Sequence, residues 1–265
     1  MLTAHDLVFR AGSRALIDHV SAQFEPARLH LIVGSNGAGK STLIRLLARL
    51  LRPGEGHVRY DGNDVADRSQ RDLAQRRAVL SQAVEVAFSL PVRELVLMGR
   101  YPHFTARPGA SDEQICQEVM RFFDVIGMAD RSYGTLSGGE RQRVHFARVL
   151  AQIWRPLDGA TRLLFLDEPL TFLDIRHQID FMEKIRLFSS QKDAIVVGVV
   201  HDLNLAAQFA DRVILLHGGR ILADGPPRDV LTEKYLREAF GVTPVLLTNP
   251  ATGKTHLAFE ARNLT

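Results

Sequence analysis

The stretch "GSNGAGKST", Gly34 to Thr42, matches the phosphate-binding pattern G-x-x-x-x-G-K-[ST] without a mismatch. The residues before it, 29–33 ("LHLIV"), are typical of a short buried strand, and those after it, 41–51 ("STLIRLLARLL"), are typical of a helix. This context suits phosphate binding, because the glycines let backbone N–H groups converge on phosphate oxygens at the positive end of a helix. The sequence therefore predicts a nucleotide site rather than a glycine-rich turn without a ligand.

The side chains that follow the glycines fit this prediction. In a phosphate-binding loop of this kind, Lys40 contacts the β- and γ-phosphates and the Ser41 hydroxyl holds Mg²⁺. The helix that they open is amphipathic, and its apolar face is expected to consist of Leu43, Leu46, Leu47 and Leu50.

Length and composition limit the classes of protein to which the chain can belong. The 265 residues carry 33 basic and 30 acidic side chains, so the net charge of +3 gives no reason to expect a nucleic-acid partner. The single cysteine, Cys116, excludes an intrachain disulfide and fits a reducing compartment. The N-terminus lacks the apolar core of a signal peptide, and the longest apolar run, residues 194–200, is only strand-sized. We therefore expect a protein that does not cross a membrane.

The order of sequence patterns predicts an α/β fold. Two apolar runs, "LLFLDEP" (residues 163–169) and "AIVVGVVHD" (residues 194–202), are typical of buried parallel strands and flank a helical segment. We expect a P-loop NTPase core of mostly parallel sheet, with an N-terminal antiparallel β subdomain and an inserted α-helical subdomain. The expected boundaries within the single domain 1–265 are residues 1–83 and 151–240 for the core, 84–150 for the helical subdomain and 241–265 for a C-terminal tail.

A second anion site is predicted at "LSGGE", residues 136–140. Ser137, Gly138 and Gly139 open a helix, so a hydroxyl and free backbone N–H groups meet a positive helix end. One nucleotide has one γ-phosphate, yet the chain has two such cradles. The economical explanation is that two chains clamp one ATP between them, and the alternative is an ordinary serine cap with a glycine turn.

These motifs, taken together, resemble the ATP-binding subunits of ABC transporters over nearly the whole chain. The resemblance rests on five landmarks in order: the P-loop, Gln82 at the end of a strand, "LSGGE", "LLFLDEP" with Asp167 and Glu168, and His201 in "VVHD". It implies that Asp167 holds Mg²⁺, that Glu168 is the general base for the attacking water and that His201 contacts the γ-phosphate. Asp174 resembles the D-loop residue that runs across a dimer.

The resemblance assigns a complete set of site residues. Those expected to contact nucleotide are Gly34, Ser35, Asn36, Gly37, Ala38, Gly39, Lys40, Ser41, Thr42, Gln82, Ser137, Gly138, Gly139, Glu140 and Asp174. Those expected at the metal are Ser41, Gln82 and Asp167, and those expected in catalysis are Glu168, His201 and Lys40. The expected cofactors are thus ATP and Mg²⁺.

The chain departs from the family pattern at three positions. Where the family often places a ring to stack on adenine, the sequence has Arg10 and Ala11, and Phe9 is the nearest aromatic residue. The signature ends in Glu140 where glutamine is more usual, and Phe172 occupies a position that is usually small.

Two stretches, residues 90–104 and 201–225, resemble the importer branch that serves iron chelates, haem and cobalamin. A segment around Trp154 resembles haem-uptake subunits in particular, with siderophore or cobalamin uptake as the alternatives. The resemblance implies a dimeric permease, a substrate-binding protein and a second copy of this chain as partners, a peripheral position on the cytoplasmic face of a membrane, and no direct contact with the cargo. A soluble ABC ATPase that acts on DNA or ribosomes is disfavoured by the lack of a basic tract or second cassette. A module that binds ATP without hydrolysis is disfavoured by Glu168 and His201.

The segment 82–104 is expected both to sense the γ-phosphate and to form a groove for a permease helix. Gly99 and Pro102 break the helical pattern there, which favours a loop with Arg100, Tyr101 and His103 pointing outward.

Overall fold

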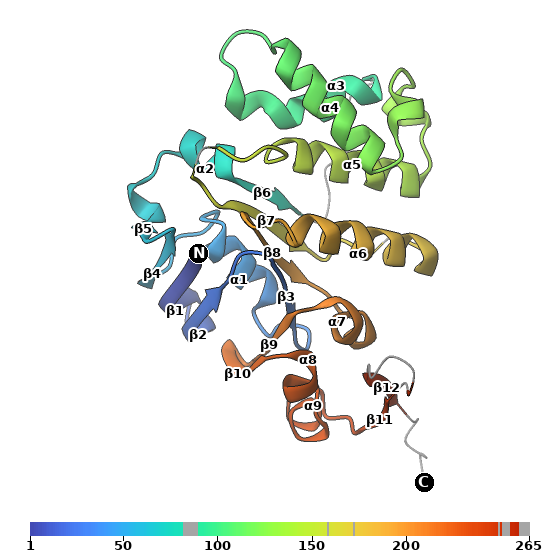
Figure 1. The fold of residues 1–265 in the computed structure, drawn as a ribbon. Coiled ribbons are helices and arrows are strands. Elements are labelled where there is room, and N and C mark those ends of the chain that lie inside the picture. Colours follow the sequence, from blue (N-terminus) through green and yellow to red (C-terminus); the bar gives the residue numbers. More distant parts are fainter. Residues whose placement is uncertain (82–89, 158, 172, 249, 251–254, 260–265) are drawn as a thin grey trace.

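The computed structural model describes residues 1–81, 90–157, 159–171, 173–248, 250 and 255–259. Two sheets and a group of helices form the body of the molecule, and a small hairpin lies near the C-terminus (Figure 1). This mixed α/β architecture, with a mostly parallel sheet, an antiparallel N-terminal sheet and inserted helices, confirms the predicted fold class.

The central sheet has the order β10-β9-β3-β8-β7-β6. The strands β9, β3, β8, β7 and β6 run parallel, and β10 pairs antiparallel with β9 at one edge. Their bounds are Arg28–Val33 for β3, Arg77–Leu80 for β6, Arg162–Asp167 for β7, Ala194–Val199 for β8, Arg212–His217 for β9 and Arg220–Gly225 for β10.

Alternate residues of the inner strands face two separate hydrophobic cores. In β7, Leu164 and Leu166 face the core beneath the inserted helices, whereas Leu163 and Phe165 face the core that contains α1 (Lys40–Leu47). Burial on both faces explains why the two apolar runs predicted parallel strands.

The antiparallel sheet has the order β2-β1-β4-β5. The buried faces of its strands pack against the core that contains α1, which we call the second core. Its strands are β1 (Leu2–Ala11), β2 (Arg14–Phe24), β4 (Glu55–Tyr60) and β5 (Asn63–Asp64). The helix α2 (Gln70–Arg76) then leads into β6.

Three helices stand together above the central sheet: α3 (Val92–Leu97), α4 (Ala110–Phe122) and α5 (Gly138–Ala151) (Figure 1). Short 3₁₀ turns accompany them, among them η2 (Met98–His103) and η3 (Ile126–Met128). The helix α6 (Ile175–Ser189) connects β7 with β8, and α7 (Leu203–Phe209) connects β8 with β9. The helices α8 (Pro227–Val230) and α9 (Glu233–Phe240) follow β10.

Two sequence expectations about which side chains are buried or exposed are wrong in part. The helix after the P-loop ends at Leu47, so Leu43, Leu46 and Leu47 are buried as expected but Leu50 is 53% exposed. Arg100 was expected to point outward, yet it is only 6% exposed.

Contacts with two helices hold Arg100 inside. Its Nε donates to Asp112 Oδ1 at 3.0 Å, and Nη1 donates to the Ala151 carbonyl at 2.7 Å. The turn η2 can approach α5 this closely because residue 99 is a glycine: a Cβ there would lie 2.0 Å from the Arg148 carbonyl oxygen. Tyr101, by contrast, is exposed as expected. The prediction is wrong for His103, which is half-buried and whose Nε2 lies 2.7 Å from the Gln152 carbonyl oxygen.

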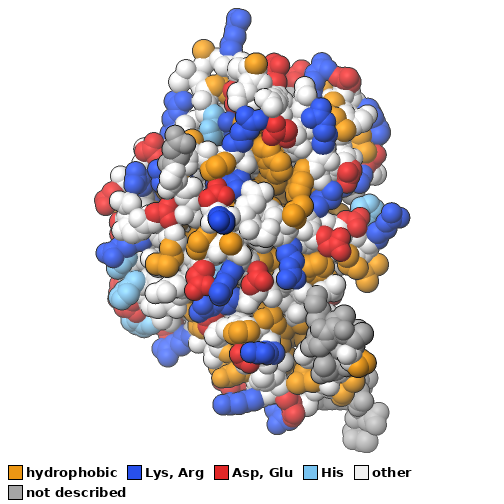
Figure 2. Space-filling model, in the orientation of Figure 1, with side chains coloured by type: hydrophobic (Ala, Val, Ile, Leu, Met, Phe, Trp, Pro, Cys, Tyr) orange, Lys and Arg blue, Asp and Glu red, His pale blue; other side chains and the backbone are white. Residues whose placement is uncertain are grey.

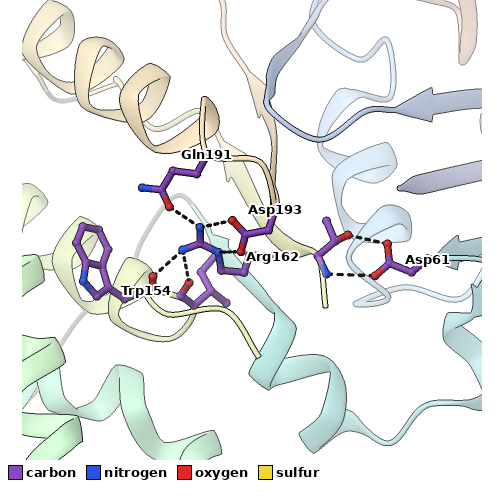
Figure 3. Close-up of polar contacts among 7 residues, drawn as sticks. Asp61, Trp154, Arg162, Gln191 and Asp193 are labelled. Atoms are coloured by element: carbon purple, nitrogen blue, oxygen red, sulfur yellow. Dashed lines mark hydrogen bonds and ion pairs between the residues drawn. The ribbon is translucent and has the colours of Figure 1, made fainter. Parts of the chain in front are cut away.

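The segment around Trp154 is anchored by a buried arginine (Figure 3). The Arg162 guanidinium donates to both carboxylate oxygens of Asp193, to the Gln191 side chain and to the Trp154 carbonyl. The Trp154 indole N–H donates to Glu118 of α4 at 2.8 Å. These contacts fix the start of β7 to the inserted helices.

The tail, which is weakly patterned in the sequence, forms an antiparallel hairpin of β11 (Pro244–Thr248) and β12 (Thr255–Phe259). Asn204 of α7 fixes it, because its amide accepts from the Leu257 N–H and donates to the Leu257 carbonyl.

The surface carries mixed charge. On the face drawn in Figure 2, basic and acidic side chains are interspersed rather than gathered into patches of one sign. None of the helices in the described ranges combines the length and apolarity that are needed to span a bilayer.

The close packing at Gly99 leads to a first prediction. Gly99→Ala should lower the free energy of unfolding by about 1–3 kcal/mol, the usual cost of overpacking, because the added methyl meets backbone that cannot move aside. Chemical denaturation measures this. Gly127→Ala is the matched control, since a Cβ at Gly127 meets nothing within 4 Å. Equal stability of the two variants would contradict the packing described here.

Candidate functional site

The P-loop joins β3 to α1 at the centre of the sheet, and two of its glycines are required by close backbone approach. A Cβ at Gly34 would lie 2.2 Å from the Leu216 carbonyl oxygen, and one at Gly39 would lie 2.4 Å from that of Leu16. Gly39 is also the residue before α1, with φ +102°, and as a glycine it provides no side chain to cap the first turn of this helix. The N–H groups of that turn are therefore available to an anion.

Lys40 lies inside the loop that it closes. Its ammonium group donates to the carbonyls of Gly34 at 2.9 Å and Ser35 at 3.1 Å, and the residue is 6% exposed. Burial lowers the pKa of Lys40, and the nearby carboxylates of Glu168 and Asp167 oppose that shift. A buried cation bound mainly to carbonyl oxygens is well placed to exchange those contacts for phosphate.

The carboxylate at the end of β7 meets the P-loop helix directly. The Ser41 hydroxyl donates to Asp167 Oδ1 at 2.7 Å, and Asp167 is 5% exposed. The two oxygen-bearing side chains that the sequence predicts at a Mg²⁺ site thus lie together at the mouth of the loop, and their role as ligands stays a prediction.

Glu168 follows Asp167 and faces His201, which comes shortly after the end of β8. Glu168 Oε1 lies 2.7 Å from His201 Nε2, and since a carboxylate only accepts, the imidazole nitrogen donates. The two residues line a cavity of about 530 Å³ together with Asn36 of the P-loop. The predicted base and the predicted γ-phosphate contact are therefore adjacent.

The backbone at Glu168 is unusual, with φ +52°. A left-handed conformation costs a non-glycine residue about 1–2 kcal/mol, so surrounding contacts must hold it. The Thr171 hydroxyl provides one such contact by donating to the Glu168 carbonyl at 3.1 Å.

The signature forms a helix cap in this chain. Ser137 precedes α5, its hydroxyl accepts from the Glu140 N–H, and the Glu140 carboxylate accepts in return from the Ser137 N–H at 2.7 Å. A Cβ at Gly138 or Gly139 would meet nothing within 4 Å. The predicted cap and the open glycine surface thus coexist, and Glu140 acts here as a carboxylate acceptor.

The D-loop residue Asp174 caps α6. It accepts from the His177 N–H at 2.9 Å, and the same histidine pairs with it through Nδ1. The hydrogen bond from the His177 backbone lowers the pKa of Asp174. Gln82 and Phe172 lie outside the described residues, so their predicted roles stay predictions.

The structure adds two glutamines that the sequence pattern did not single out. Gln142 of α5 donates to the Pro169 carbonyl, and Gln178 of α6 donates to the carbonyls of Leu170 and Leu173. Both side chains reach the turn that carries Glu168: Gln142 does so from α5, 27 positions earlier in the sequence, and Gln178 from α6, which begins just after the turn. Only tertiary structure could show this.

Phe9 is the aromatic residue nearest to the position where the family often places an adenine-stacking ring. Phe9 is partly buried against the second core, with its backbone paired to Ile17, so it behaves as a strand residue. The Arg14 guanidinium lies near the P-loop, 3.6 Å from where a Cβ of Gly37 would be. No sequence motif indicated Arg14.

Sequence comparison places these features among known proteins. The family model described as ABC transporter matches residues 17–171. The hemin import ATP-binding protein HmuV of Gloeobacter violaceus is 44% identical over 96% of this chain and 92% of its own length. Those of Pseudomonas fluorescens and Escherichia coli O157:H7 are 43% and 41% identical, over 96% and 95% of this chain and 97% and 96% of their own lengths.

Solved structures share the fold. One described as an inward-facing conformation of a metal-chelate type ABC transporter has a TM-score of 0.82 at 24% identity, covering 100% of this chain and 99% of that one. A dimeric bacterial ABC transporter cassette has a TM-score of 0.73 at 24% identity, covering 86% and 99%.

The geometry at Glu168 leads to a second prediction. Glu168→Gln should reduce ATP hydrolysis by at least about 10²-fold, because the amide keeps the shape but cannot accept a proton from water. ATP binding should survive. Lys40→Ala is the contrasting control, since it should weaken nucleotide binding itself. A phosphate-release assay and a nucleotide titration check both results, and near wild-type turnover by Glu168→Gln would exclude the assigned role.

Proposed function

The chain belongs to the ABC transporter family as an ATPase subunit, and we propose that it powers the import of hemin through a partner permease. The observation that supports hemin as the cargo is the set of hemin import ATP-binding proteins that are 41–44% identical over nearly the whole chain.

The site fits a nucleotide bound with Mg²⁺. Mg²⁺ is usually held by one or two protein oxygens together with substrate phosphates. Ser41 and Asp167 provide two such oxygens beside the P-loop, and Gln82 is the further ligand predicted from the sequence. When bound, the ion would neutralise charge on the β- and γ-phosphates.

The protein's own groups account for the hydrolysis step. Lys40 and the N–H groups at the start of α1 bind the phosphates. The γ-phosphate then points into the cavity that Glu168 and His201 line. Glu168 accepts a proton from the attacking water. His201 donates to Glu168 and holds its carboxylate in place until the γ-phosphate is bound.

We propose that the active form is a homodimer with ATP between the P-loop of one copy and the signature of the other. The surface at Gly138 and Gly139 supports this arrangement, because a Cβ at either position would meet none of the described atoms within 4 Å. The dimeric ABC cassette with the same fold provides a precedent.

A groove on the inserted helices is the proposed permease contact. A cavity of about 460 Å³ lies between α3, α4 and η3, with Leu97 and Met120 among its apolar lining and Ile126 37% exposed at its edge. Arg93 and Asp130, which form an ion pair, also line it. A helix with one apolar face and charged flanks would fit this surface. Binding there would place the subunit on the cytoplasmic face of the membrane without contact with the cargo.

The cargo is tested in reconstituted membranes. The complex of this chain with its permease should couple ATP hydrolysis to hemin movement, and a soluble hemin-binding protein should be needed for the full rate. Hemin, a ferric siderophore and cobalamin are offered in parallel. Movement of siderophore or cobalamin without hemin would exclude the proposed cargo and leave the importer function standing.

The permease contact is tested by substitution at the edge of the groove. Ile126→Glu should lower transport by about tenfold while the ATPase rate of the isolated subunit changes less than about twofold, because a charge replaces an apolar contact far from the nucleotide. Leu187→Glu is the matched control, since Leu187 of α6 is 62% exposed and lies outside the groove. Full transport by Ile126→Glu would exclude this groove as the permease contact.

A further inference from the structure

The turn that follows Glu168 is held by side chains rather than by regular secondary structure. Pro169 has no N–H, and Glu168 has a left-handed backbone that must be stabilised from outside. The carbonyls of Glu168 and Pro169 are bound by Thr171 and Gln142, and those of Leu170 and Leu173 are bound by Gln178. The direction of the Glu168 side chain therefore depends on these donors.

Among them, Gln142 is distinct because of the helix that carries it. Thr171 belongs to the turn itself, and Gln178 belongs to α6, which begins just after the turn. Gln142 lies on α5, the helix that Ser137 caps. Its Nε2 atom lies 2.5 Å from the Pro169 carbonyl oxygen, and this half-buried bond joins the inserted helices to the residue next to Glu168.

We propose that Gln142 is a positioning residue for hydrolysis: by holding the Pro169 carbonyl, it fixes the backbone from which Glu168 reaches the attacking water. The proposal rests on ATP hydrolysis as the proposed function, and it assigns Gln142 no contact with nucleotide. Because α5 carries both Ser137 and Gln142, any rotation of this helix also changes the distance that the bond must span.

The alternative is that Gln142 only stabilises the fold or the signature. The two roles differ in one respect. A residue that acts through Glu168 loses its effect when Glu168 can no longer act as a base, whereas a residue that acts on the fold or the signature affects hydrolysis regardless of residue 168. A double-mutant cycle separates them.

The experiment uses the full chain and measures ATP turnover at saturating ATP. Gln142→Met keeps the length of the side chain but cannot donate, and it should lower kcat about tenfold with less than about a twofold change in KM, as expected for a displaced general base. In the Glu168→Gln background, adding Gln142→Met should change the residual rate less than about twofold.

Controls keep the result interpretable. Gln142→Glu retains the shape and its carboxylate also lacks the donor, so it should show the same loss of kcat and replaces Gln142→Met if the latter is poorly folded. Gln23→Glu, at an exposed position of β2, makes the same change of charge and should leave kcat unchanged. Thermal unfolding and ATP affinity report on the fold of each variant.

Two results would overturn the proposal: wild-type kcat in both Gln142 variants, or an equal loss with and without Glu168. Neither result bears on the cargo. Conversely, a complex that hydrolyses ATP but does not move hemin would contradict the proposed function and leave the role of Gln142 intact.

Discussion

The parallel pairing of β3 with β8, and of β8 with β7, brings the ends of three strands to one edge of the sheet. The P-loop follows the first strand, His201 follows the second and Asp167 with Glu168 closes the third. Side chains more than 120 positions apart in the sequence therefore meet within hydrogen-bond distance, as Ser41 and Asp167 do. The P-loop, the carboxylates and His201 all depend on this register for their positions.

The site combines rigid and strained parts. Gly34 and Gly39 are required because neighbouring carbonyls leave no room for a Cβ, so the phosphate loop packs closely against the backbone around it. Glu168, by contrast, has a left-handed backbone that is stabilised by contacts from Thr171 and from a turn bound by Gln142 and Gln178. In physical terms, the proposed phosphate site is a preformed loop, and the proposed catalytic carboxylate lies on a turn that is held by Thr171 and by side chains from α5 and α6.

Local patterns predicted much of the site. The glycine spacing identified the P-loop, and a carboxylate directly after an apolar run identified Asp167 and Glu168, because each signal is contained in a few consecutive residues. Arg100 was misplaced for the opposite reason. Gly99 was interpreted as a helix breaker, but it is a point of close contact with α5, and this contact buries the arginine against Asp112. Gln142 and Arg14 were missed because their partners lie far away in the sequence.

The central claim of this account is that one ATP is clamped between the P-loop of one copy and the signature of another. The most direct measurement is ATP-dependent crosslinking of Asn36→Cys and Gly138→Cys with a short bifunctional maleimide in the Glu168→Gln background. The native Cys116 should not react with the maleimide, because it is 4% exposed and burial raises its pKa to about 12. The account predicts a covalent dimer with Mg²⁺ and ATP and none with ADP or without nucleotide. The absence of a covalent dimer with Mg²⁺ and ATP would contradict this account. An equal yield of covalent dimer with and without nucleotide would also contradict it.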